Sequence, residues 1–191
     1  MKRLTGFLSL FLLSVLPLYA ADLNDLTYAT TDGEVTITDC NEATTGELVI
    51  PDTIEGNPVT TIGTFAFRFC TGLTNITIPD TVTSIGREAF KDCTILKGIT
   101  IGNGVSSIGA GALWRCKSLT NITIPDSVTS IGKGAFGSCT SLTALTFLGD
   151  APKAGEKVFS RPTHTIYRKP KAKGWGDTFA GRPVKLISEK P

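Results

Sequence analysis

The chain has 191 residues, of which 41% are hydrophobic and 19% are charged, and its formal net charge at pH 7 is +2. This length accommodates one domain of ordinary size, and the composition excludes a disordered chain. The small net charge conceals an asymmetry, because residues 21–150 contain 7 Lys or Arg against 14 Asp or Glu, whereas residues 151–191 contain 10 against 3. The basic end could contact anionic partners, but a solvated surface that balances the acidic body is the simpler interpretation.

The first 20 residues have the pattern of a secretory signal peptide. Lys2 and Arg3 precede an apolar run over residues 4–18, and small residues follow at Ala20 and beyond. We expect cleavage after Ala20, which makes the mature protein secreted or displayed on the cell surface. The run is short for a membrane span, and no second apolar segment of about 18 residues follows, so no transmembrane span is expected.

Residues 21–49 are predicted to form an N-terminal cap made of strands. Apolar and polar residues alternate on both sides of Asp32-Gly33, which is the pattern of a hairpin closed by a tight turn. The end of a repeat array exposes apolar groups and open backbone edges, so each end needs a covering structure.

A repeat of 23 residues organises residues 78–146, where three copies follow one another without a gap. The copies are IPDTVTSIGREAFKDCTILKGIT (78–100), IGNGVSSIGAGALWRCKSLTNIT (101–123) and IPDSVTSIGKGAFGSCTSLTALT (124–146). A longer copy precedes them at 50–77, with five additional residues around 55–58 that we expect to form a surface loop. This period predicts a solenoid of roughly five turns, in which the repeats over 50–162 bury their apolar faces against one another.

Each repeat contains three kinds of inward-facing position. Its last third is spaced as a strand with apolar residues inward and threonines outward, as at Leu96, Ile99 and Ile101. A second short extended segment carries a valine and an isoleucine and ends at a glycine. The motif Ala-Phe-x-x-Cys, as at residues 89–93, is spaced as one face of a short helical turn. The expected fold class is a repeat solenoid of the α+β type, with short strands plus a short helical turn per repeat.

These motifs carry a family resemblance. LxxLxL at a constant spacing resembles leucine-rich repeats, and the combination IPDxVTSIGxxAFxxCxSLTxIT is similar to the BspA-type branch of that family. The sequence departs from this pattern in the loop Gly102-Asn103-Gly104, where the neighbouring copies contain Pro-Asp-Thr or Pro-Asp-Ser, and at Leu113, where phenylalanine is usual. The resemblance implies a curved solenoid of the kind found in secreted and surface proteins of bacteria, which mediate adhesion or other protein contacts.

The repeat decays after Phe147, and residues 163–191 are predicted to form a C-terminal cap rather than a second domain. This basic stretch contains aromatic residues and glycines but no further cysteine or leucine in phase. The ending is similar to C-terminal caps on related bacterial repeat proteins.

No catalytic machinery is predicted. His164 is the only histidine, and no cysteine lies near it in the sequence, so a structural or exposed role is favoured over catalysis. The P-loop, GxGxxG, HExxH and GxSxG motifs are absent. Local backbone hydrogen bonds explain the recurrent turn aspartates, and a ladder spreads carboxylates too widely for a calcium site. We therefore expect no enzyme, no cofactor and no metal.

Four cysteines recur every 23 residues, at 70, 93, 116 and 139, and Cys40 stands apart in the cap. Neighbouring repeats about 5 Å apart are within reach of a disulfide, but stacked side chains point in parallel rather than toward each other. Buried free thiols that fill the core are therefore expected.

The outward positions of the strands form the candidate partner-binding stripe, which consists of Asn75, Thr77, Thr100, Asn121, Thr123 and Thr146. Threonine also suits the solvated face of any strand, so the stripe by itself names no ligand. The leading hypothesis is a secreted, non-enzymatic binding or adhesion module that recognises a protein or glycan outside the cell, with no nucleic-acid partner. The alternative is a structural envelope or surface protein that self-associates through its ends.

Overall fold

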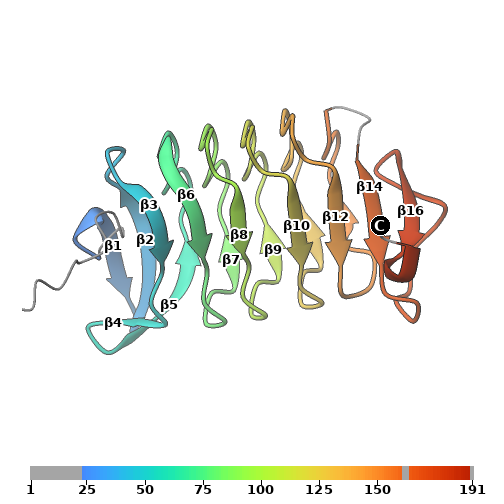
Figure 1. The fold of residues 1–191 in the computed structure, drawn as a ribbon. Coiled ribbons are helices and arrows are strands. Elements are labelled where there is room, and N and C mark those ends of the chain that lie inside the picture. Colours follow the sequence, from blue (N-terminus) through green and yellow to red (C-terminus); the bar gives the residue numbers. More distant parts are fainter. Residues whose placement is uncertain (1–22, 161–163, 190–191) are drawn as a thin grey trace, which may run out of the picture.

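The computed structural model describes residues 23–160 and 164–189, so the predicted signal peptide lies outside the described residues. The repeats stack as successive rungs along one axis and form an elongated ladder (Figure 1). Each rung contributes to three sides of the ladder, which are named here the strand face, the ladder sheet and the turn face.

The strand face contains one strand from each rung, and neighbouring strands run parallel. These strands are β3 (Thr45–Val49), β6 (Gly72–Thr77), β8 (Gly98–Thr100), β10 (Asn121–Ile124), β12 (Ala144–Phe147), β14 (Thr165–Arg168) and β16 (Arg182–Leu186). They belong to two sheets, β3-β6-β8 and β10-β12-β14-β16, and the short β15 (Thr178–Phe179) pairs antiparallel with β16. Sheet pairing on this face is therefore interrupted between β8 and β10.

The ladder sheet is continuous from β1 to β13. Its strands are β1 (Leu26–Thr31), β2 (Glu34–Cys40), β5 (Asn57–Ile62), β7 (Ser84–Ile85), β9 (Ser107–Ile108), β11 (Ser130–Ile131) and β13 (Lys153–Ala154). The hairpin predicted around Asp32-Gly33 is present as β1 and β2, and both turn residues have positive φ, 53° and 78°. The five additional residues of the first repeat form a second hairpin, in which β4 (Thr53–Ile54) pairs with β5.

The turn face consists of the segments 63–70, 86–93, 109–116, 132–139 and 155–160, and the helical turns predicted there were wrong. In the first segment the N–H groups of Phe65, Phe67 and Phe69 donate to carbonyl groups of the next rung, whereas those of the residues between them bond within the segment. An α-helix requires successive N–H groups to bond within one segment, so this alternation gives stacked turns instead. The described residues contain only two helices, the 3-10 helices η1 (Leu23–Asp25) and η2 (Ile187–Glu189), and the fold is a β-solenoid.

The inward positions predicted from the repeat form one continuous core. In the rung that begins at residue 78, Val82, Ala89, Phe90, Cys93 and Leu96 have no exposed surface. Aromatic rings stack between neighbouring rungs, with centroids 5.1 Å apart for Phe67 and Phe90. Leu113 takes the equivalent place in the following rung and is equally buried. Burial of this periodic apolar set holds the rungs together.

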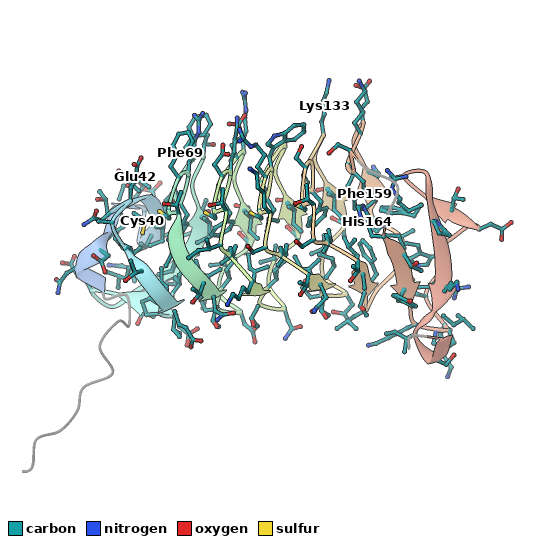
Figure 2. The ribbon with its side chains drawn as sticks, turned by 45° about the horizontal axis from the view of Figure 1, so that its top comes forward. Cys40, Glu42, Phe69, Lys133, Phe159 and His164 are labelled. Carbon is teal, nitrogen blue, oxygen red and sulfur yellow. The ribbon has the colours of Figure 1, made fainter. Side chains whose placement is uncertain are left out.

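All five cysteines are buried, and none forms a disulfide. The thiols of Cys93, Cys116 and Cys139 donate to carbonyl oxygens of the preceding rung, with sulfur–oxygen distances of 3.0 to 3.1 Å. Burial raises the pKa of Cys93 and Cys139 to about 12. Cys40 lies at the N-terminal end of the ladder (Figure 2). The thiols therefore fill the core and also connect adjacent rungs.

The C-terminal part continues the strand face and closes its end. Strands β14 and β16 add in parallel to β12, and the rings of Trp175 and Phe179 lie 4.9 and 5.4 Å from the Phe147 ring. His164 is 3% exposed, its Nδ1 lies 3.2 Å from the Leu142 carbonyl oxygen, and burial lowers its pKa. We propose the boundaries 21–49, 50–162 and 163–191 for the N-terminal cap, the repeats and the C-terminal cap.

Candidate functional site

A hollow of about 460 Å³ lies on the strand face at the interruption between β8 and β10. It is lined by strands β6, β8 and β10 and by residues from the loops that follow β8, β10 and β12. None of its lining residues is charged. They are Asn75, Ile76, Thr77, Gly98, Ile99, Thr100, Ile101, Asn103, Asn121, Ile122, Thr123, Pro125 and Leu148.

The loop after β8 accounts for the position of this hollow. A side-chain carbon at Gly102 or Gly104 would overlap backbone atoms of Pro79 or Asp80, so only glycine lets the loop pack this closely against the preceding rung. The Asn103 N–H also donates to the Asp80 carboxylate over 2.6 Å. The loop is thus held against the preceding rung, and its residues Ile101 and Asn103 line the hollow.

The structure places five of the six predicted stripe residues in the hollow's lining: Asn75, Thr77, Thr100, Asn121 and Thr123. The sixth, Thr146, was predicted to point outward but is 7% exposed, so that expectation was wrong. Thr146 pairs in register with Tyr167 of β14, whose large side chain is itself buried. The C-terminal part therefore covers the end of the stripe.

The polar groups of the hollow differ in how much they are fixed by contacts with the protein. The Asn75 amide donates to the Glu47 carboxylate over 3.0 Å, and it lies over Gly98, where a side-chain carbon would come within 2.5 Å of the Asn75 oxygen. By contrast, Thr100, Asn121 and Thr123 are exposed. Asn75 is therefore a fixed part of the wall, whereas the exposed hydroxyl and amide groups are accessible to a ligand.

Sequence reasoning missed three contributors to the hollow, namely Asn103, Pro125 and Leu148. Asn103 lies in the loop that departs from the repeat pattern, so its signal was visible as a change of residue type. Pro125 and Leu148 follow the pattern or lie beyond it, and only the packing of neighbouring rungs brings them to the hollow.

The hollow is suited to binding rather than to acid–base chemistry. Threonine hydroxyls and asparagine amides donate and accept hydrogen bonds without charge, and isoleucine, proline and leucine add apolar contact. β8 and β10 lie side by side here without sheet pairing, so their exposed side chains are the groups that a ligand can reach. No cluster of three or more His, Cys, Asp or Glu that could hold a metal is found among the described residues.

Residues 47–167 match the family described as BspA type leucine rich repeat region, with six copies. The chain belongs to this family. The roughly five predicted turns were thus one too few.

Solved structures of bacterial leucine-rich repeat proteins have the same fold. A leucine-rich repeat protein of T. pallidum is 29% identical, with a TM-score of 0.71 over 76% of this chain and 70% of that one. A protein from Bacteroides capillosus is 32% identical, with a TM-score of 0.59 over 66% of this chain and 96% of that one. A leucine-rich cell surface protein from Faecalibacterium prausnitzii is 30% identical, with a TM-score of 0.60 over 82% of this chain and 46% of that one.

No curated protein matches this BspA-type chain. Within the described residues, no helix is both long and apolar enough to cross a bilayer.

Proposed function

We propose that this chain is an exported, non-enzymatic binding or adhesion module, and that the strand-face hollow recognises a protein or glycan ligand outside the cell. The observation that carries the proposal is the uncharged hollow, which gathers five of the Thr and Asn residues of one stripe. Leucine-rich repeat relatives, one of them described as a cell surface protein, support a binding role at the surface. Export rests on the signal-peptide pattern of residues 1–20.

The chemistry of the hollow favours a neutral polar ligand. A sugar ring offers hydroxyl groups for threonine and asparagine together with an apolar C–H face for the partly exposed Leu148. An extended peptide offers backbone N–H and C=O groups that can bond with the exposed side chains of Thr100, Asn121 and Thr123. A strongly charged ligand would lose hydration here without gaining an opposite charge.

The test is a binding panel of matrix proteins and neutral glycans, read with the unchanged protein and with Thr100→Glu and Thr123→Glu. Both threonines are exposed on opposite sides of the interruption, so a carboxylate at either place should fill the hollow without disturbing the core. We expect each change to weaken binding by about tenfold or more, because an unpaired charge is desolvated.

Thr83→Glu is the matched control, because Thr83 is an exposed threonine that precedes β7 on the ladder sheet. If Thr100→Glu and Thr123→Glu bind every ligand as tightly as the control does, the hollow is not the binding site. Sedimentation velocity at increasing concentration separates binding from self-association, since the binding proposal does not require the monomer to assemble.

A further inference from the structure

The turn face is basic although the body of the chain is acidic. The four of its segments that lie within residues 21–150, namely 63–70, 86–93, 109–116 and 132–139, contain five of the seven Lys and Arg of that range, but only two of its fourteen Asp and Glu. The five cations are Arg68, Arg87, Lys91, Arg115 and Lys133. The charge of this side is thus opposite to that of the remaining body.

Aromatic side chains are exposed on the same side. Phe65 and Phe69 are 40% and 41% exposed, and the Arg68 guanidinium lies 5.2 and 4.7 Å from their ring centroids. Both phenylalanines have positive φ, 65° and 64°, which is costly for a bulky residue. In the turn segments 109–116 and 132–139, the positions equivalent to Phe65 are Gly111 and Gly134. Neither burial nor backbone preference explains these two rings.

A groove of about 780 Å³ continues the turn face toward the C-terminus. Among its lining residues, Ala110 and Gly111 are small and the others have longer side chains. The ring of Trp114 forms a flat aromatic wall of the groove. The indole lies against Gly134 and Gly137 of the next rung, and a side-chain carbon at Gly137 would overlap it. The absence of side chains at these two glycines therefore leaves the space that the Trp114 ring occupies.

Cations outnumber carboxylates in the groove. Its charged lining residues are Glu88 and four cations, namely Arg87, Lys91, Lys133 and Lys157. The Glu88 carboxylate lies 2.9 Å from the Lys91 ammonium and 3.3 Å from the Arg87 guanidinium, and these contacts hold its pKa below the usual range. The Glu88 charge is thus already neutralised by its neighbours, and the Lys133 ammonium lies 3.2 Å from the exposed Glu156 carboxylate beside the groove.

Figure 2 shows Phe69 and Lys133 projecting along the same edge of the ladder, several rungs apart. Aromatic rings and cations therefore alternate along a surface whose rungs repeat about every 5 Å. This arrangement fits an extended ligand that presents rings and negative charges in regular alternation.

We propose that the turn face binds an acidic polysaccharide, with Trp114 stacking on a sugar ring and the cations around it contacting carboxylate or sulfate groups. An acidic peptide would satisfy the cations but has no repeating ring for the aromatic residues. The surface and the ligand class both differ from those of the uncharged strand-face hollow.

The test measures binding of heparin and of polygalacturonate to the protein by isothermal titration calorimetry at several salt concentrations. We expect binding to both, with affinity that falls as sodium chloride is raised. Trp114→Ala and Lys133→Glu should each weaken binding by about tenfold, whereas Trp114→Phe, which keeps a ring, should lose less.

Lys97→Glu is the matched control, because it makes the same charge change at the start of β8. The proposal is overturned if Lys97→Glu weakens heparin binding as much as Lys133→Glu, or if correctly folded Trp114→Ala binds normally. It is also overturned if polyglutamate or single-stranded oligothymidylate binds as tightly as both polysaccharides. Thr100→Glu should leave heparin binding unchanged, which separates this surface from the strand-face hollow.

Discussion

The stability of the ladder should depend on the volume of the side chain at Phe90, and Leu113 supplies a natural comparison. Phe90 has no exposed surface, and its ring stacks on Phe67 at 5.1 Å with an interplanar angle of 14°. One rung later Leu113 fills the equivalent place and is equally buried. We therefore consider the substitutions Phe90→Ala and Phe90→Leu.

The two substitutions should differ in cost because they differ in the cavity that they leave. Replacing a fully buried phenylalanine by alanine costs about 4 kcal/mol, since transfer free energy is lost and a cavity opens. Leucine keeps most of the volume, so Phe90→Leu should cost about 1.5 kcal/mol, part of it from the lost ring pair. Phe69→Ala removes a ring that is 41% exposed and should cost less than about 1 kcal/mol.

Urea unfolding followed by far-ultraviolet circular dichroism measures these free energies. The slope of the unfolding free energy against urea concentration should be the same in all variants. An equal slope shows that the same array unfolds in each variant, which allows the free energies to be compared. The reasoning is refuted if Phe90→Leu costs as much as Phe90→Ala, or if Phe69→Ala costs as much as either.

Three further predictions follow from burial and backbone conformation. Because burial raises the pKa of Cys93 and Cys139 to about 12, these two thiols should resist alkylation at pH 8 in the native protein, whereas denatured, unreduced protein should show five free thiols; fewer would reveal a disulfide. Because burial holds the pKa of His164 below its usual value, the unfolded chain binds more protons, so the free energy of unfolding should fall as pH drops below about 6.5. Urea midpoints between pH 8 and 5.5 measure this fall, and a similar fall in His164→Phe would assign it to other groups. Because Phe65 has a φ of 65°, Phe65→Gly should be more stable than Phe65→Ala by about 1 kcal/mol in the same assay, and equal stabilities would show that the backbone there is not strained.

The repeat phase predicted the core because burial in a solenoid is a local property of each repeat. Residues such as Val82, Phe90 and Leu96 recur in phase, and all three are fully buried. The helical turn was wrong because Ala-Phe-x-x-Cys has the same spacing in a helix and in two consecutive turns. Bonds from N–H groups such as that of Phe67 to the next rung decide between them, and a single repeat does not contain that partner.

The candidate site was harder to predict from the sequence than the core, because it depends more on contacts between rungs. The outward direction of Thr100 and Thr123 followed from strand alternation, and both are exposed. Thr146 fits the same alternation but is buried, because a strand from outside the regular repeats lies beside it. The hollow also takes lining residues from separate segments of the chain, such as Leu148 from the loop after β12, and only the packed array brings them together.

The interruption between β8 and β10 also has a mechanical consequence. At this level the ladder sheet stays paired through β7 and β9, and backbone hydrogen bonds link residues 86–93 to the following turn segment, but the strand face lacks sheet pairing. A stack joined on two sides and released on the third bends most easily about the joined sides. The molecule should therefore bend more easily between β8 and β10 than elsewhere along its axis. A ligand bound at this place on the strand face would change the angle between the two ends of the ladder.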